Sequence, residues 1–586
     1  MRNGMKKRII RALACALLLA LGMSLGACAP RMKPARTSDG KTLFRLGFSG
    51  APDSLNPYAA GNDEAAAVLS LVYDTLFSVD VETGEYSGAL CREWSVTDSA
   101  ARGGRLWKIA LAGDVTWHDG EPLTASDVEF ALQSMKDFST RYSYPDCEFI
   151  DVTGIAVEDD THLAFIAWGP DPSVLECLSH IPVVPRHIWN SIPGVEYGTS
   201  GVPRDFVRGG EALRQTEPNA KNMVGSGLYT WGGYENGICT LKLNPRYWNG
   251  ASAAETVELR FGCTDPAQLL RDRQLDACWD MPGSSYERLG REGGYALAAG
   301  TAGELYTLSF CFAPSASGSR TRLSAREVRA AMDYALDHAG LMNRAFGGGM
   351  PALGLLPPYS DGNYEDALSA PRGYSPESAA WLLDNAGYTD PDGDGIRSSP
   401  DGKALSFTLA YSDAVPAWEA AAEEIRYSLE GVGIEISLRP LPPEQLLEIT
   451  TTGEYDLLLS GVQSYNDPFY TLGMFYWNHG DNAIAAPGLH ENVQPGWNHS
   501  GYQNDEYDAL YEQMLYAEST VRLDLTARLG EILYNDAAVL PIGFSASYQA
   551  GNAVWMGLCP YRGEGLFFTP EILRQQLQSI TAGGKR

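Results

Sequence analysis

The stretch "DVTWHDGEPLTASDVEFALQSM" (Asp114–Met135) joins a His-Asp-Gly turn to an amphipathic helix. Thr124 can cap that helix, and Asp127 follows it at the three-residue spacing of a capping box. Apolar side chains then recur at helical spacing and predict one buried face: Val128, Ala131, Leu132 and Met135. A turn followed by a capped helix occurs in many folds that combine helices and strands. The segments on either side of it therefore decide the fold class.

Strands and helices alternate on both sides of this stretch. Residue patterns predict strands at 43–50, 93–112 (a pair), 224–248 (a pair), 434–441 and 455–460. Helical spacing predicts helices at 63–77, 324–346, 375–387, 416–430, 505–518 and 520–537. Ser324 with Glu327 forms a second candidate capping box, and Ser375 is a candidate cap. The alternation predicts the α/β class.

The composition is that of a large, folded, acidic protein. At 586 residues the chain is too long for one ordinary core, so we expect two or more domains. Its formal net charge of −29 would become −34 without the first 27 residues, which carry five basic residues and no acidic one. Such a surface repels phosphate backbones, so we expect no nucleic-acid partner.

Residues 1–27 have the pattern of a signal peptide. A basic start, "MRNGMKKRIIR", precedes the apolar run "ALACALLLALGMSL". The ending "LGAC" resembles a bacterial lipobox, which implies that Cys28 carries diacylglycerol and anchors the chain on the outer side of the cell membrane. An ordinary secretory peptide is the alternative. Residues 28–41 then form a flexible tether, and no later segment has the roughly 18 apolar residues of a membrane span.

The cysteine residues say less about function than the N-terminal segment does. Eight cysteines follow Cys28, and none of them forms a Cys-x-x-Cys pair, so zinc or thioredoxin-like redox sites lack support. An extracytoplasmic compartment permits disulfides. Free buried thiols and one or two bridges both remain open.

Five segments, in order, resemble the large extracytoplasmic solute-binding proteins of peptide/nickel-type ABC importers. The stretch Asp114–Leu132 looks like that family's most recognisable motif. The others are "SLNPYAAGN…CREWSV" (54–96), "VGSGLYTW" with "LKLNPRYWNG" (224–250), "REVRAAMDYALDHAGLMNRAFGGGMPALGLLPP" (326–358) and "NHSGYQNDEYDAL" (498–510). Together they span Thr42–Pro570, which is nearly all of the chain after the tether.

The resemblance implies a periplasmic-binding-protein-like fold of two lobes that close on a ligand by a hinge. Lobe one would combine 42–76, 216–303 and 541–586, with 77–215 as an extra domain packed on it, and lobe two would be 304–540. The hinge crossings would lie near Gly303 and Leu540. The resemblance also implies a monomer that is not an enzyme and that delivers solute to ABC permease subunits in the membrane.

Peptide-binding members of that family carry an aspartate four residues before a proline, where it pairs with the peptide's α-ammonium. The proline here is Pro468, and Ser464 stands at the aspartate's position. Asp467 could take the role if the loop is shifted. The missing carboxylate puts free-amine peptides in doubt, because a buried ammonium needs a partner.

Aromatic residues gather in the same matched segment, which follows the apolar run 455–460. Tyr465, Tyr470 and Trp477 are candidate ligand contacts, since such rings combine flat apolar area with a polar atom; core packing is the alternative. Tyr306, on the matched hinge strand, and Asn56, in the first loop, are further candidates.

One acidic loop, "DPDGDGIRSSPD" (390–401), fits the start of a calcium loop. Asp390, Asp392 and Asp394 precede Gly395, and Asp401 stands at the twelfth position, where an EF-hand has Glu. We therefore consider a structural calcium site; a polar turn is the alternative. No other cofactor is expected.

Motifs for catalysis are missing from the sequence. His479, His490 and His499 have no metal-ligand spacing, and neither a G-x-S-x-G elbow nor a P-loop occurs. We predict a lipid-anchored ABC-importer protein that binds peptides. The alternatives are the same fold binding an oligosaccharide or nickel chelate, or a ligand-sensing surface lipoprotein.

Overall fold

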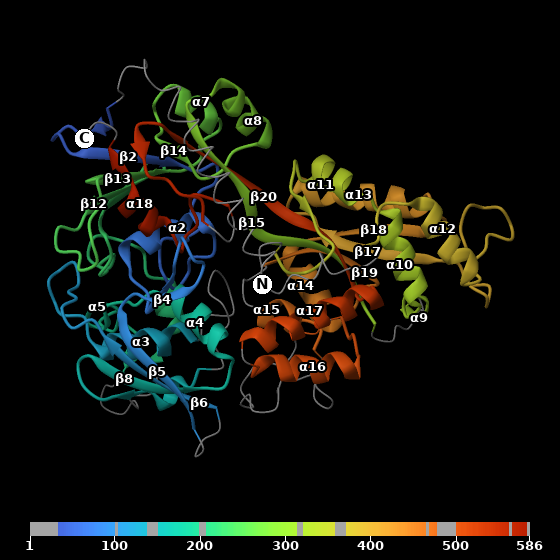
Figure 1. The fold of residues 1–586 in the computed structure, drawn as a ribbon, viewed down its shortest axis with the longest axis horizontal. Coiled ribbons are helices and arrows are strands. Elements are labelled where there is room, and N and C mark those ends of the chain that lie inside the picture. Colours follow the sequence, from blue (N-terminus) through green and yellow to red (C-terminus); the bar gives the residue numbers. More distant parts are fainter. Residues whose placement is uncertain are drawn as a thin grey trace, which may run out of the picture.

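The computed structural model describes residues 33–99, 104–136, 150–197, 207–312, 320–357, 371–463, 468–476, 498, 500–517, 519–561 and 565–582. Two parts lie side by side, and the long strands β15 (Tyr295–Phe310) and β20 (Val539–Asn552) run from one part to the other (Figure 1). Strands and helices alternate as predicted, so the class is α/β.

One sheet continues through both parts, in the order β11-β12-β13-β2-β14-β20-β15-β19-β17-β18. In its centre β15 pairs antiparallel with β20 on one side and with β19 (Leu457–Gln463) on the other. The β15–β20 register shifts between Thr301 and Leu305, and Gly303 in this interval has φ +77°, a conformation that favours glycine. On β15 the shift lies at the predicted crossing near Gly303. On β20 it falls between Phe544 and Ala546, whereas Leu540, near which the second crossing was predicted, pairs with Leu308 within the core of lobe two.

The part assigned to lobe one contains the end of this sheet that is formed by β11, β12, β13, β2 and β14. Apolar residues of β2 are buried there, and β2 pairs in parallel with both β13 and β14. Strand β1 lies within the predicted tether and pairs with β2, so this part of the tether is attached to the sheet. The elements are β1 (Ala35–Arg36), β2 (Thr42–Gly47), α2 (Asp63–Val72), β11 (Tyr229–Glu235), β12 (Ile238–Leu243), β13 (Thr256–Arg260), α7 (Pro266–Arg271), β14 (Ala277–Cys278), α8 (Gly283–Glu292), β21 (Trp555–Met556), α18 (Leu573–Ser579) and β22 (Thr581–Ala582).

Within 77–215 a separate sheet has the order β5-β6-β8-β7. The opening stretch builds helix α3 beside it: the Asp127 carboxylate accepts a hydrogen bond from the Thr124 backbone N–H at 2.8 Å, which is one half of the predicted capping box. The other half does not form, because the Thr124 hydroxyl donates to the same carboxylate and the Asp127 N–H bonds to the Thr124 carbonyl. The elements are β3 (Phe77–Val79), β4 (Tyr86–Gly88), β5 (Cys91–Asp98), β6 (Arg105–Leu111), α3 (Ala125–Lys136), the 3₁₀ turn η1 (Val152–Gly154), β7 (Ala156–Val157), β8 (His162–Ala167), α4 (Asp171–His180), α5 (Arg186–Trp189), β9 (Glu196–Tyr197), β10 (Val207–Arg208) and α6 (Gly210–Arg214).

The part assigned to lobe two covers the far end of the long sheet with helices (Figure 1). Its core joins strand residues such as Leu308, Phe407 and Leu459 to Ile425 of α13. The elements are α9 (Arg320–Leu323), α10 (Arg326–Ala335), α11 (His338–Ala345), β16 (Met350–Pro351), α12 (Pro376–Asn385), β17 (Ser406–Ser412), α13 (Pro416–Glu430), β18 (Glu435–Leu441), α14 (Pro443–Thr452), α15 (Pro468–Gly473), α16 (Asp505–Leu515) and α17 (Ser519–Asp536).

Two predicted helices are shorter than expected. The helix predicted at 63–77 ends at Val72, because Tyr73 is extended (φ −112°, ψ 147°). The helix predicted at 324–346 divides into α10 and α11, because Asp337 caps the second one by accepting a hydrogen bond from the Gly340 N–H. The predicted Ser324–Glu327 capping box is wrong: Ala325 is the N-cap of α10, and no side chain caps it.

Both cysteine states occur. Cys177 is disulfide-bonded, whereas the free thiols among the described residues are Cys91, Cys239, Cys263, Cys278, Cys311 and Cys559. Among the helices so described, none has the length and apolar character needed to cross a membrane.

Candidate functional site

A cavity of about 440 Å³ opens in lobe two beside β19. Strands β15, β17 and β19 line it together with helices α13 and α14 and the segment after α15. This volume lies in the range of small-ligand pockets. Its walls are mainly apolar, with side chains that include Trp418, Leu446, Leu458, Val462, Met474 and Phe475.

The local sequence explains where this cavity lies. The apolar run that ends in Leu459 forms β19, as predicted, and its carboxyl end reaches the cavity at Ser460 and Gly461. Helix α14 begins with Pro443 in its first turn, where proline needs no hydrogen-bond donor, and turns Leu446 toward the cavity. Leu447 beside it is 68% exposed, so apolar surface continues to the rim.

Among the described residues that line the cavity, Glu304 is the one acidic side chain, and none is basic. It follows Gly303 on β15 and is partly buried. A Cβ at Gly461 would collide with the Glu304 carboxylate, so glycine at this position of β19 leaves room for the acid. Burial raises the pKa of Glu304, and a hydrogen bond with Tyr306 opposes part of that rise.

The predicted candidate Tyr306 lies two residues further along β15. Its ring stacks on Phe346 with the centroids 4.0 Å apart, and Trp418 meets it edge-on at 5.3 Å. Burial, followed by the charge of Glu304, raises the pKa of the Tyr306 hydroxyl. Two aromatic neighbours therefore hold Tyr306 in place next to the cavity.

The other predicted ligand residues are placed elsewhere or lie outside the described residues. Ser464, Tyr465, Asp467 and Trp477 belong to the latter group, as do Cys28 and the three histidines His479, His490 and His499. Their predicted roles stay predictions.

Tyr470 and Asn56 are both buried and do not line this cavity. Tyr470 packs edge-on against Phe469, with their ring centroids 5.0 Å apart. The side-chain amide of Asn56 donates hydrogen bonds to the backbone carbonyls of Leu213, Arg214 and Thr216. In this geometry Asn56 attaches the first loop to the end of α6.

Sequence reasoning missed Glu304 and Phe475, which both line the cavity. Phe475 belongs to the aromatic segment after β19, and no local pattern there separates it from Phe469, which does not line the cavity. A signal for Glu304 was present, since a lone acid stands at the start of the apolar strand "ELYTLSF" immediately after the hinge glycine.

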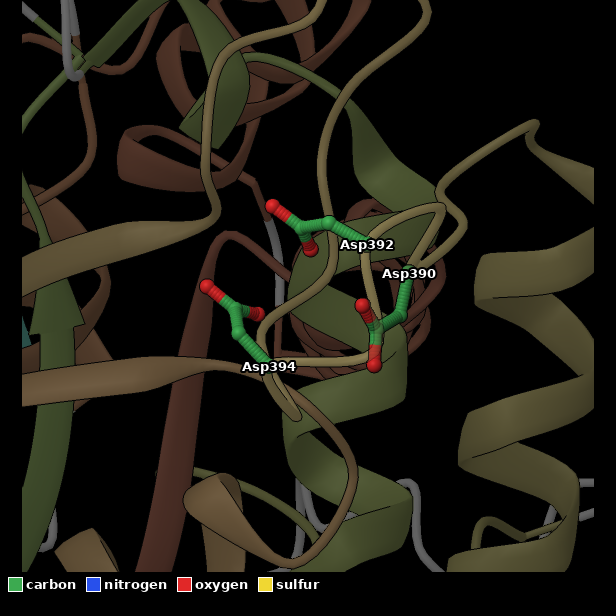
Figure 2. A group of neighbouring side chains, drawn as sticks. All are labelled: Asp390, Asp392 and Asp394. Atoms are coloured by element: carbon green, nitrogen blue, oxygen red, sulfur yellow. The ribbon is translucent and has the colours of Figure 1, made fainter.

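The predicted calcium loop brings three of its four acids together. Asp390, Asp392 and Asp394 each place a carboxylate oxygen within 4.8 Å of the others (Figure 2). Asp401 is engaged separately, by the Lys403 ammonium at 3.0 Å and by the Ser399 hydroxyl.

Within this loop Asp390 already accepts hydrogen bonds from the N–H groups of Gly393 and Gly395, at 2.7 and 3.0 Å. Desolvation would raise the pKa of Asp390, but these two donors together with hydrogen bonds from Asp392 and Asp394 lower it. Calcium binding stays a prediction. Calorimetric titration of calcium into chelator-treated protein tests it, and the absence of both heat and a melting shift would remove it.

The sequence is similar to known proteins over most of its length. Residues 85–483 match the family described as "Bacterial extracellular solute-binding proteins, family 5 Middle". The chain is 23% identical over 580 residues to the periplasmic oligopeptide-binding protein OppA of Salmonella typhimurium, covering 95% of this chain and 96% of that one.

Solved structures share the fold. The oligopeptide-binding protein AppA from Bacillus subtilis, in complex with a nonapeptide, matches with a TM-score of 0.65 at 18% identity, covering 95% of this chain and 100% of that one. A mannohexaose-bound periplasmic oligopeptide-binding protein from Thermotoga maritima matches with a TM-score of 0.63 at 21% identity, covering 92% and 98%. The family match covers more than half of the sequence, and the two-lobe prediction is confirmed. The chain therefore belongs to the bacterial extracellular solute-binding proteins, family 5.

Proposed function

We propose that the protein is the lipid-anchored substrate-binding component of an ABC importer, which captures peptides between its lobes and delivers them to a membrane permease. The observation that carries the proposal is the cavity of about 440 Å³ at the carboxyl end of β19, beside the strands that join the two parts. The described lining residues of the cavity all belong to lobe two, so a ligand held there favours the closed state to the extent that it also contacts lobe one.

The chemistry of the cavity walls suits part of a peptide. Trp418, Met474 and Phe475 offer apolar and aromatic surface for a side chain, while the Ser412 and Ser460 hydroxyls offer hydrogen bonds. A volume of this size accommodates a portion of an oligopeptide rather than its full length. The names of OppA and AppA, both oligopeptide-binding proteins, support the same ligand class.

Other observations support the lipid anchor and the delivery of solute to a permease. The lipobox-like ending at Cys28 supports a lipid anchor, and the match to extracellular solute-binding proteins supports a position outside the cytoplasm. Permease subunits are the partners that such a component requires. Mass spectrometry of the mature N-terminus tests the anchor: diacylglycerol on Cys28 is expected, and an unmodified N-terminus at another residue would contradict it.

The ligand itself can be identified directly. Native mass spectrometry of the purified protein, followed by denaturation and sequencing of the released molecule, is expected to yield peptides. Thermal melting in the presence of di- to octapeptide pools is expected to show stabilisation, by about 2.7 kcal/mol at a free ligand concentration of 100 times Kd. Stabilisation by oligosaccharides or nickel–histidine, and by no peptide pool, would contradict the peptide proposal.

A further inference from the structure

We propose that Glu304 is the anchor for a positively charged group of the ligand, so that the preferred solutes carry an ammonium or guanidinium group next to an apolar moiety. This inference rests on the proposed function in one respect: it assumes that solute is captured in the cavity beside β19.

Glu304 has no cation of its own. It makes no ion pair with any residue in the described part of the chain, and the lining residues so described include no lysine, arginine or histidine. Burial raises the pKa of Glu304, and a partly buried carboxylate without a counter-charge is unfavourable. A bound cation would supply the missing partner through charge-assisted hydrogen bonds.

The position of the carboxylate is fixed from two sides. Gly461 on β19 leaves the space that the carboxylate occupies, and Tyr306 on β15 is available to hydrogen-bond it. Tyr306 is itself held between Phe346 and Trp418. A binding group that is placed in advance loses little conformational freedom when the ligand arrives, which favours affinity.

The surroundings favour a cation with an apolar neighbour. Trp418 and Phe475 line the same cavity, and the face of an aromatic ring attracts positive charge while it also packs against apolar groups. An anionic group would meet the negative charge of Glu304 and find no basic side chain among the described lining residues. The cavity therefore discriminates by charge as well as by shape.

The location of Glu304 also connects recognition to closure. Glu304 lies one residue beyond Gly303, within the interval where the register of β15 against β20 shifts. A cation bound to Glu304 therefore sits next to the point where the two parts join.

The test compares wild type with Glu304→Gln, which removes the charge but keeps the shape. The probes are three pools of pentapeptides built from Gly, Ala, Leu and Phe: one with a free N-terminal amine, one N-acetylated, and one N-acetylated with a single lysine. Spermidine and phenethylamine are the non-peptide cations, and mannohexaose is the neutral solute. Isothermal titration calorimetry gives Kd for each combination.

We expect wild type to bind at least one cationic peptide pool about 10- to 100-fold more tightly than the neutral pool, and Glu304→Gln to lose that margin. Glu304→Asp, which keeps the charge on a shorter side chain, should retain part of it and guards against a folding defect in the first variant. Glu435→Gln, at an exposed position on β18, is the matched control and should bind like wild type.

Equal affinities of Glu304→Gln and wild type for the cationic probes would overturn the anchor. Binding of mannohexaose alone, or of none of the cationic probes, would overturn it too, and the lack of peptide binding would also count against the proposed function. If wild type binds spermidine or phenethylamine but no peptide pool, and Glu304→Gln loses that binding, the anchor stands while the peptide proposal fails. The two failures are thus distinguishable.

Discussion

At the scale of single residues, Asp74 shows how one buried charge holds distant segments together. Its carboxylate accepts hydrogen bonds at 3.0 Å from the side chains of Ser226, Tyr247 and Trp248, and it forms an ion pair with Arg574. Asp74 is fully buried, and Arg574 lies 500 positions away in the sequence.

We predict that Asp74→Asn lowers the free energy of unfolding by about 3–5 kcal/mol, because it leaves Arg574 buried without a counter-charge. Urea unfolding followed by fluorescence measures the change. Lys41→Ala is the control, since the Lys41–Glu255 pair is exposed and should contribute less than about 1 kcal/mol. Equal effects of the two substitutions would refute this assignment.

Single residues also show where sequence reasoning stops. Tyr306 was identified as a candidate but Glu304 was not, although they are two positions apart on one strand. The sequence does not reveal that Gly461, 157 positions later, opens the space for the acid. Asn56 was predicted to contact ligand, and its side-chain amide instead binds three backbone carbonyls, a use that depends on where α6 packs.

At the scale of elements, an ion pair joins the end of α4 to the segment before α18. The two ring nitrogens of His180 make separate contacts: Nδ1 lies 2.8 Å from the Glu176 carbonyl, and Nε2 lies 3.2 Å from the Glu571 carboxylate. Burial alone would lower the pKa of His180, but Glu571 and Glu176 more than offset this and raise it to about 9. Burial likewise opposes the effect of His180 on Glu571, whose pKa ends below its ordinary value.

These pKa shifts predict a pH window for the pair. The folded pKa of His180 lies above its unfolded value of about 6.5, so its contribution is complete below pH 6.5 and is lost as the pH rises through about 9. The folded pKa of Glu571 is lowered, so its contribution is present above about pH 4.5 and is lost as the pH falls through the lowered value.

We therefore expect His180→Gln to cost about 2–3 kcal/mol of unfolding free energy at pH 6 and much less at pH 10. Urea titrations of wild type and variant across this range measure the difference. His162→Gln is the control, because the His162 side chain is half exposed and its ring contacts the neighbouring Asp159 and Thr161. A cost for His180→Gln that does not change with pH would contradict the ion pair.

Elements were predicted well where a local signal decides them, and poorly where two local signals compete. The carboxylate half of the capping box at Thr124 forms, the cap at Ser375 forms, and β19 follows its apolar run. In contrast, the continuous helical pattern at 324–346 hides a break, because Asp337 caps a new helix within it. An aspartate within an amphipathic helical pattern can either continue the helix or cap a new one, and tertiary packing decides between the two.

At the scale of the whole molecule, the two-lobe arrangement was predicted from the order of five motifs and not from periodicity. The reason is physical: the strands that form the connection, β15 and β20, are separated by more than 200 residues, and their pairing is set by contacts that no local pattern encodes. Lobe boundaries at single-residue precision stay predictions.

The two parts also meet away from these strands. The hydroxyl of Tyr516, at the end of α16, donates a hydrogen bond to the Trp168 carbonyl at 3.5 Å, and Trp168 follows β8. This contact joins lobe two to the extra domain. We expect it to break when the lobes separate, so it should slow opening and release of ligand and have little influence on the first encounter.

We predict that Tyr516→Phe, which removes only the hydroxyl, raises the dissociation rate of the bound peptide pool about two- to fivefold and leaves the association rate nearly unchanged. Surface plasmon resonance with the pool that stabilises wild type most strongly measures both rates. Tyr427→Phe is the matched control, because Tyr427 on α13 is 78% exposed. If Tyr516→Phe and Tyr427→Phe release peptide at the wild-type rate, the contact does not hold the lobes together; if the association rate falls instead, Tyr516 acts during capture.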